Sequence, residues 1–321
     1  MKFRLLHAPR PVALRIRAGR SDVHGKVRLQ LPAGWRSEPV AAEVGLVKAG
    51  DETIVRFDVR APEGAGPIRI RPEVEVDGKT WSMREDVIDY PHIPVEAVLQ
   101  PASFRLVPLQ LRIPAGRIGY LHGSGDSIPE DLAHVGVQVE TIDDELLRTG
   151  DLDRFAAIVV GIRAYNTRAA VVANHGRLMQ YVERGGVVVV QYVTVSRWSP
   201  LEAAIGPFPL EIGPGRITDE TAAMVAVDPD DPLLRAPNRL TPADFDGWVQ
   251  ERGLYFGATW DPRYRPLFRA SDPGEEPQEG STLVARHGKG RYVYTGLSFF
   301  RQLRAGVPGA YRLFCNLVSS P

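Results

Sequence analysis

Polar and aromatic side chains gather in four short segments, each of which directly follows a predicted strand. In an open α/β sheet, ligands bind beyond the carboxyl ends of the strands, so these segments are expected to meet at one edge. Amides, carboxylates and guanidinium groups hydrogen-bond hydroxyls, and aromatic faces pack on apolar ring faces. The pattern predicts either a site for a polyhydroxylated ligand or a solvated rim of ion pairs. The segments are HGSGD (122–126), GIRAYNTR (161–168), QYVTVSRW (191–198) and TGLSFFRQ (295–302), and their candidate residues are His122, Ser124, Asp126, Arg163, Tyr165, Asn166, Gln191, Tyr192, Arg197 and Arg301.

A second polar and aromatic stretch is PADFDGWVQERGLYFGATWDPRY, residues 242–264. Asp246 and Glu251 could act there as general acid and general base on a glycosidic or amide bond, since such chemistry needs two carboxyl groups of unequal pKa. The same composition is also typical of a long insertion held by aromatic packing and ion pairs. Asp246, Trp248 and Glu251 therefore join the candidate ligand-binding residues, with hydrolysis as the alternative.

Motifs for cofactors and metals are incomplete. In HGSGDSI, Ile128 stands where a dinucleotide-binding loop needs its third glycine. HGKGR (287–291) is typical of a hairpin turn, and TIDDELL of the start of a short helix. The seven histidines form no HxxH pair. We predict no catalytic residue, no metal and no cofactor.

Composition restricts the classes of protein further. The 321 residues suffice for two domains, and 39 basic residues balance 39 acidic ones, which is not typical of nucleic-acid binders. The single cysteine, Cys315, lies in an apolar run and is expected in the core. The N-terminal apolar run is interrupted by Arg and Pro, so no signal peptide is predicted, and no stretch is long enough for a membrane helix. The compartment stays open.

The two halves of the chain differ in periodicity. Residues 1–95 contain short alternating strands such as KVRLQLPAGW and TIVRFDVRAP, separated by Pro and Gly, which predict an immunoglobulin-like β-sandwich. Residues 96–113 are expected to be a Pro-rich linker. Residues 114–321 mix continuous apolar strands with helices, among them one helix at 167–186 and a hairpin at HGKG, which predicts a largely parallel sheet covered on both faces.

Several long phrases of the second half resemble a known family. RIGYLHGSGDSIPEDL, FAAIVVGIRAYNTR, NHGRLMQYVERGGVVVVQY, SPLEAAIGPFPL, TPADFDGWVQERGLYF and VPGAYRLF are similar to the C-terminal region of long bacterial PIG-L/LmbE-family proteins. In that family, a zinc-dependent N-acetylglucosamine deacetylase domain precedes a β-sandwich and an α/β domain. The zinc-binding His-Pro-Asp-Asp-Glu segment and the later histidine pair are absent here. The resemblance therefore implies an accessory region, with a deacetylase catalytic domain as its partner in cis or in trans.

The α/β half also resembles the class I glutamine amidotransferase superfamily, which implies a flavodoxin-like, three-layer fold. Those enzymes carry a nucleophilic cysteine on the turn after a central strand. The equivalent positions, Gln191 to Val193, offer no thiol. We expect a non-catalytic accessory region that binds carbohydrate or a partner protein. A hydrolase that uses carboxylates, or a structural assembly module, are the alternatives.

Overall fold

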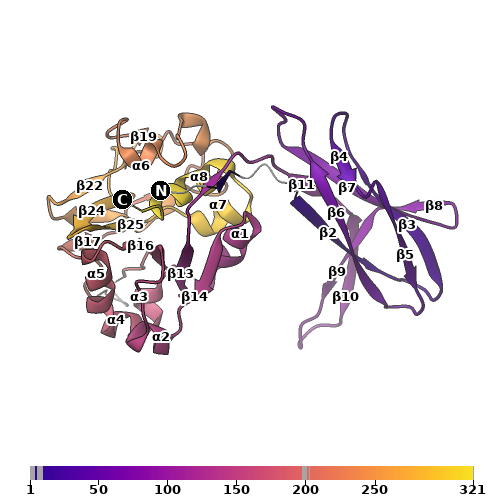
Figure 1. The fold of residues 1–321 in the computed structure, drawn as a ribbon, viewed down its shortest axis with the longest axis horizontal. Coiled ribbons are helices and arrows are strands. Elements are labelled where there is room, and N and C mark those ends of the chain that lie inside the picture. Colours follow the sequence, from indigo (N-terminus) through magenta and orange to yellow (C-terminus); the bar gives the residue numbers. More distant parts are fainter. Residues whose placement is uncertain (1–3, 6–9, 197–200, 202, 321) are drawn as a thin grey trace. The chain divides into compact units, whose positions relative to one another are not determined.

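The computed structural model describes residues 4–5, 10–196, 201 and 203–320. The chain divides into two compact units, residues 7–109 and residues 110–321 together with 1–6 (Figure 1). No helix in the described ranges is long and apolar enough to cross a membrane. Each unit is described by itself below.

The first unit is built from two antiparallel sheets in a β-sandwich-like arrangement. Their inner faces follow the alternation that the sequence predicts: β6 buries Val55, Phe57 and Val59, and β3 buries Val27 and Leu29 in the same cluster. One sheet has the order β2 (Arg10–Arg17), β6 (Glu52–Arg60), β4 (Arg36–Glu38); the other has the order β11 (Phe104–Leu106), β7 (Ile68–Val76), β3 (Val23–Gln30), β5 (Ala41–Leu46), with β8 (Lys79–Trp81) on β7.

The expectation of a linker at 96–113 is wrong for most of that segment. Strand β10 (Glu96–Pro101) pairs with β9 (Met83–Ile88) in a separate hairpin, and β11 pairs with β7. The side chains of β10 are all exposed. The hairpin therefore depends on its backbone hydrogen bonds rather than on burial, and such a strand leaves no alternating apolar pattern in the sequence.

The second unit is organised around a seven-stranded sheet. Its first five strands pair in parallel, and the last two are added by antiparallel pairing, β24 with β25 and β22 with β24. The prediction of a largely parallel, buried sheet is confirmed, since every residue of β15 and β16 is buried. The order is β14 (Gln138–Thr141), β13 (Arg117–Leu121), β15 (Ala157–Val160), β16 (Val187–Gln191), β25 (Gly290–Thr295), β24 (Thr282–His287), β22 (Tyr264–Pro266).

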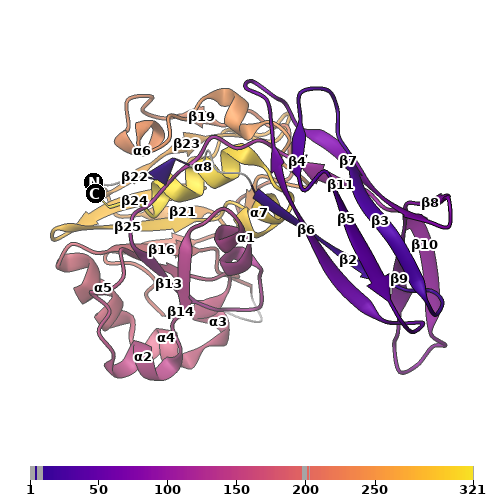
Figure 2. The same ribbon diagram turned by 45° about the vertical axis from the view of Figure 1, so that its right-hand side comes forward.

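Helices cover both faces of this sheet (Figures 1 and 2). Residues of α2, α4 and α5 share one buried cluster with Ile158, Val160, Val188 and Val190. The other face carries α1, α7 and α8. The helices are α1 (Ile128–His134), α2 (Asp144–Thr149), α3 (Ala164–Thr167), α4 (Ala169–Ala173), α5 (His175–Glu183), α7 (Phe299–Arg304) and α8 (Pro308–Leu317).

The single helix expected at 167–186 is divided into the end of α3, α4 and α5. Arg168 adopts an extended backbone between α3 and α4. Its guanidinium donates to the carbonyl oxygen of His122 at 3.0 Å and pairs with Asp144. These tertiary contacts coincide with the break in the helix, and the local sequence pattern does not contain them.

Residues 210–269 form an irregular segment between β16 and β24. It contains three small two-stranded sheets, the helix α6 (Pro232–Arg235) and the 3-10 helix η1 (Pro242–Phe245). The strand pairs are β17 (Leu210–Ile212) with β21 (Gly257–Trp260), β18 (Arg216–Ile217) with β20 (Gly253–Leu254), and β19 (Val225–Ala226) with β23 (Phe268–Arg269); separately, β1 (Arg4–Leu5) pairs with β12 (Arg112–Ile113).

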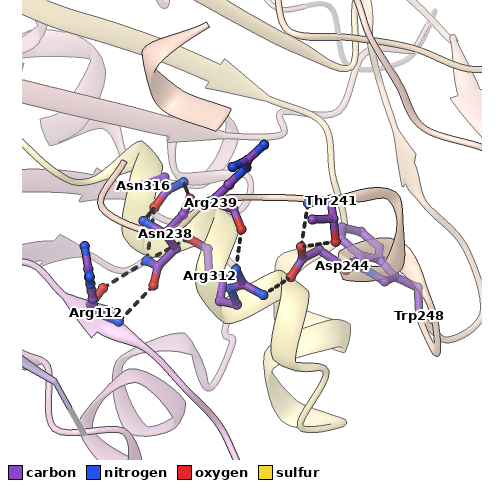
Figure 3. Close-up of polar contacts among 8 residues, drawn as sticks. All are labelled: Arg112, Asn238, Arg239, Thr241, Asp244, Trp248, Arg312 and Asn316. Atoms are coloured by element: carbon purple, nitrogen blue, oxygen red, sulfur yellow. Dashed lines mark hydrogen bonds and ion pairs between the residues drawn. The ribbon is translucent and has the colours of Figure 1, made fainter. Parts of the chain in front are cut away.

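A buried amide network fastens part of this segment to α8 (Figure 3). Asn316 is fully buried and donates to the carbonyl oxygens of Leu233 and Asn238, both at 2.7 Å. Its Oδ1 accepts from the backbone N–H of Asn238 at 2.9 Å and from the Asn238 side chain at 3.0 Å. Asn238 also exchanges two hydrogen bonds with the backbone of Arg112. One helix residue thereby positions the segment that leads to η1.

We expect Asn316→Ala to lower the free energy of unfolding of the second unit by about 3 kcal/mol, because several buried polar groups lose their partners at once. Urea unfolding followed by circular dichroism measures the change. Asn174→Ala is the matched control: the Asn174 amide makes one hydrogen bond, to the Ala170 carbonyl oxygen, at a partly exposed site. Its cost should stay near 1 kcal/mol. Equal losses in the two variants would contradict the assigned role of Asn316.

Candidate functional site

The loops after β13 and β15 touch through their backbones. The N–H of Ser124 donates to the carbonyl oxygen of Ile162 at 3.0 Å. A Cβ atom on Gly123 would lie 2.0 Å from that oxygen and 2.7 Å from the backbone nitrogen of Ala164. Only glycine permits this approach without a shift of the backbone. The close contact places exposed Ser124 beside the start of α3.

The loop after β16 is fixed to the same neighbour. The N–H of Arg163 donates to the carbonyl oxygen of Tyr192 at 2.8 Å. The Asn166 side chain donates to the Thr194 carbonyl oxygen at 2.8 Å and accepts from the Thr194 N–H at 2.9 Å. Asn166 was predicted to bind ligand, but these contacts make it a positioning residue for the loop.

Three aromatic rings meet at the end of β16. The ring of Tyr192 stacks on Tyr255, with centroids 5.6 Å apart and planes 23° apart, and lies 5.9 Å from the ring of Phe300. Tyr255 has φ of +57° and Arg163 has φ of +58°, so two non-glycine residues in the left-handed region converge on Tyr192. We call Arg163, Tyr192, Tyr255, Phe300 and Arg301 the Tyr192 cluster.

Charged groups surround the phenol of Tyr192. Burial raises its pKa, the guanidinium groups of Arg163 and Arg301 act in the opposite direction, and Glu251 adds to the rise. The net effect is a raised pKa, so the phenol stays protonated at neutral pH and can donate a hydrogen bond. Arg163 is exposed. The site therefore offers cationic and neutral donors beside aromatic surface.

Glu251 and Phe300 fix the orientation of the Arg301 side chain. Its Nε donates to Oε1 of Glu251 at 2.8 Å, and its guanidinium carbon lies 4.7 Å from the centre of the Phe300 ring. The Ser298 hydroxyl donates to the same Glu251 oxygen at 2.8 Å. Glu251 is buried, so its visible role is to orient Arg301.

A buried polar chain supports the neighbouring loop. The Gln191 side chain donates to the Tyr120 hydroxyl at 3.0 Å, and that hydroxyl lies 2.7 and 2.8 Å from the two oxygens of Asp126. Burial holds the pKa of Tyr120 well above its usual range. Tyr120 was not predicted, because an aromatic residue inside a strand has the pattern of a core residue. In the described chain, Oε1 of Gln191 is buried without a hydrogen-bond partner.

His122 and Ser124 of the loop after β13 have contacts of their own. His122 lies with its ring centre 5.1 Å from that of Tyr120, and its Nε2 is 3.2 Å from the Thr141 hydroxyl oxygen. Ser124 places its hydroxyl 3.4 Å from the Ile162 carbonyl oxygen. The hydroxyl beside His122 therefore belongs to Thr141 at the end of β14, while the Ser124 hydroxyl contacts a backbone carbonyl oxygen. Within the described residues, no hydrogen bond joins the Ser124 hydroxyl to a histidine that could act as its base.

Some candidate residues lie apart from the cluster. Tyr165 is buried, and its hydroxyl lies 2.8 Å from Nδ1 of His175. Trp248 is buried beside η1, where its Nε1 donates to the Asp244 carbonyl oxygen at 3.1 Å (Figure 3). Tyr165 and Trp248 were candidate ligand-binding residues, and the structure places both rings in the core. Arg197 lies outside the described residues.

The two carboxylates that could form an acid–base pair have different surroundings. Glu251 belongs with Arg301, as described above. Asp246 is exposed and follows η1 directly. Its negative charge raises the pKa of the Arg252 guanidinium, although burial has the larger effect and lowers it. No hydrogen bond or ion pair in the described chain joins Asp246 to the Tyr192 cluster. The arrangement favours binding over hydrolysis at this cluster.

The turn after β16 has ordinary backbone geometry. No residue from Gln191 to Val193 has a positive φ; the left-handed residue at a strand-to-helix turn is Arg163, after β15. Cys315 is fully buried on α8, and burial raises the pKa of its thiol to about 12. Within the described ranges, no group of His, Cys, Asp and Glu side chains is gathered as a metal site.

A shallow hollow borders the irregular segment, and none of the candidate residues lines it. Its volume is about 280 Å³. Half-buried Trp260 lines it with Gln278, Glu279 and the backbone of several glycines. Glu279 is paired with Arg269, and Gln278 donates to the Arg216 carbonyl oxygen at 3.0 Å, so its polar side chains already have partners.

Comparison with known proteins places part of the first unit. Residues 17–76 match the model of the NPCBM-associated NEW3 domain of alpha-galactosidase. This range covers β3 to β7 of the β-sandwich-like unit. No curated protein matches the chain.

Several solved structures align with about two thirds of this chain. They include the beta-galactosidase from Rahnella sp. R3 (14% identity, TM-score 0.38, 63% of this chain and 31% of that chain). The exo-beta-1,4-mannosidase Op5Man5 from Opitutaceae bacterium strain TAV5 has 14% identity and a TM-score of 0.39, over 65% of this chain and 37% of that one. A protein described as ThuA-like from Bacteroides uniformis has 11% identity and a TM-score of 0.34, over 64% and 90%. This chain thus spans about a third of the galactosidase, and such TM-scores carry no argument about function.

We expect the thiol of Cys315 to be unreactive in the folded protein, because only the thiolate attacks and burial disfavours it. Titration with a thiol-specific disulfide reagent at pH 8 should detect no thiol within an hour, and one thiol per chain after denaturation in guanidinium chloride. Rapid reaction of the native protein would show that the thiol is accessible and would reopen a nucleophilic role.

Proposed function

We propose that this chain is a non-catalytic accessory region of a carbohydrate-active enzyme, and that its second unit binds carbohydrate at the Tyr192 cluster. The observation that carries the proposal is the convergence of two strained residues, Arg163 and Tyr255, on one buried tyrosine at the carboxyl edge of the sheet. Ligands of open α/β sheets bind at that edge.

The strain indicates that the two side chains have a use. A non-glycine residue in the left-handed region costs about 1–2 kcal/mol relative to glycine. Glycine adopts this conformation without that cost, as Gly125 does in the loop after β13 with φ of +88°. Arg163 is exposed, and within the described residues its side chain forms no hydrogen bond or ion pair that would offset the strain. A guanidinium kept at such a position is best explained by contact with a ligand.

The chemistry of the cluster suits a sugar. Guanidinium groups only donate hydrogen bonds, and sugar hydroxyl and ring oxygens accept them. The partly exposed rings of Tyr255 and Phe300 offer apolar surface on which a sugar ring can pack.

Two enzyme families are candidates for the catalytic partner of this accessory region. The match of residues 17–76 supports an accessory role beside a glycosidase, since that domain is named for alpha-galactosidase. The resemblance of the second half supports a PIG-L/LmbE-type deacetylase partner in cis or in trans. Preference for galactosides or for N-acetylglucosamine oligomers distinguishes the two. The proposal includes a flavodoxin-like, amidotransferase-like scaffold, which the parallel order β14-β13-β15-β16-β25 supports because it corresponds to 2-1-3-4-5.

Arg163→Gly tests the site most sharply. The substitution removes the guanidinium, keeps the N–H that bonds Tyr192, and relieves the strained backbone. Relief of strain and the greater freedom of glycine in the unfolded chain offset each other, so stability should change by less than about 1 kcal/mol. Affinity for the sugar should fall about tenfold or more, the value of one charged hydrogen bond.

Isothermal titration calorimetry with oligomers of galactose, mannose and N-acetylglucosamine measures the affinity, and urea unfolding measures the stability. Asp22→Gly is the matched control, since Asp22 is exposed and has φ of +55° in the first unit. It should leave sugar affinity unchanged. The proposal fails if none of the sugars binds, or if Arg163→Gly binds them as tightly as the parent.

A further inference from the structure

An exposed face of the first unit places three arginines side by side. Arg69 of β7 lies directly opposite Arg105 of β11 in the antiparallel register. Arg71 lies two positions along β7 from Arg69, and all three side chains are exposed, whereas Ile70 between them is buried. Since alternate residues of a strand share a face, the three guanidinium groups lie on one outer surface. We call these residues the arginine face.

The arginine face lacks the ion pairs found on neighbouring strands of its own sheet. Elsewhere on the same sheet, Arg28 pairs with Glu75 at 2.6 Å and Lys26 with Glu43 at 3.1 Å. Within the described residues, Arg69, Arg71 and Arg105 form no ion pair. Arg69 donates to the Ser103 hydroxyl at 3.1 Å, which is a neutral partner.

A carboxylate of the same strand already has another partner. Glu73 follows Arg71 by two positions on β7, and it accepts from the Gln30 side chain at 2.6 Å. Like charges directly opposite each other in a sheet are destabilising, and that cost is removed when anions bind between them. The face is therefore complementary to a ligand that carries several negative charges.

The spacing of the face favours a repeating anion over a single one. Neighbouring strands lie about 4.8 Å apart, and alternate residues of a strand about 6.6 Å apart. One carboxylate cannot contact three guanidinium groups distributed over that surface, whereas successive carboxylates along an extended chain can. The guanidinium fork matches a carboxylate in two-point contact.

We propose that the arginine face binds a polyuronate, a polysaccharide whose sugar units carry carboxylates. The proposal rests on the proposed function for the class of ligand, because a carbohydrate-directed accessory region meets polysaccharides. It concerns a second surface, independent of the Tyr192 cluster. The equal numbers of basic and acidic residues in the chain argue against nucleic acid as the polyanion.

The test measures binding of the full chain to polygalacturonate by affinity electrophoresis and calorimetry, at low and high salt. A neutral galactan, dextran sulfate and poly-glutamate serve as comparison polymers. The test variant is Arg69→Gln/Arg71→Gln/Arg105→Gln. The matched control is Arg17→Gln/Arg20→Gln/Arg28→Gln, which removes the same charge from arginines of this unit that already pair with Glu85, Asp77 and Glu75.

We expect the parent chain to bind polygalacturonate, more weakly as salt increases, and not to bind the neutral galactan. The test variant should lose affinity roughly tenfold, the sum of three exposed ion pairs, and the control variant less than threefold. The urea midpoint of the test variant should equal or exceed that of the parent, because repulsion between like charges is removed. This measurement separates lost binding from lost folding.

Several results would overturn the proposal. They are absence of polygalacturonate binding, an equal loss in the two triple variants, or binding of dextran sulfate or poly-glutamate as tight as that of polygalacturonate. Loss of polygalacturonate binding in Arg163→Gly but not in the test variant would move the ligand to the Tyr192 cluster, which overturns this inference and leaves the proposed function standing. Loss in the test variant alone, with no sugar bound at the Tyr192 cluster, would support this inference and overturn that site.

Discussion

The parallel pairing of β13, β15 and β16 is the constraint on which the candidate site depends. The three strands run in the same direction and are direct neighbours in the sheet. The loops after Leu121, Val160 and Gln191 therefore all begin at the carboxyl ends of the strands, side by side. The backbone approach of Gly123 to Ile162 and the bond from Arg163 to Tyr192 then join these loops in turn. Side chains far apart in sequence thereby become neighbours, with little dependence on their own identity.

Position at the strand ends could be predicted from the sequence; the role of each side chain could not. The apolar run VVVV and the glycine turn at HGSG are enough to indicate buried parallel strands and their loops. Asn166 and Tyr165 occupy the same short helix, yet one bonds the Thr194 backbone and the other turns toward His175. Such choices depend on partners 10 to 28 positions away, which a local pattern does not contain.

One residue that the sequence analysis missed, Tyr255, enters the site from an irregular part of the chain. Tyr255 follows β20 in the segment between β16 and β24, and its position against Tyr192 depends on a left-handed backbone and a hydrogen bond from Tyr294 to its carbonyl oxygen. The aromatic content of residues 242–264 did indicate this segment, but it favoured Trp248, which packs beside η1 instead. The composition of a segment can indicate that it contributes to a site. Which of its aromatic rings lies in the site depends on tertiary packing.

The central claim is that carbohydrate binds at the Tyr192 cluster. The most direct measurement is the change in backbone amide NMR signals of the full chain on addition of the tightest-binding oligosaccharide. We expect the largest shifts at Ser124, Arg163, Tyr192, Tyr255 and Arg301, with little change on the outer strands of the first unit. Saturable shifts confined to other residues, or none at all at millimolar sugar, would contradict it.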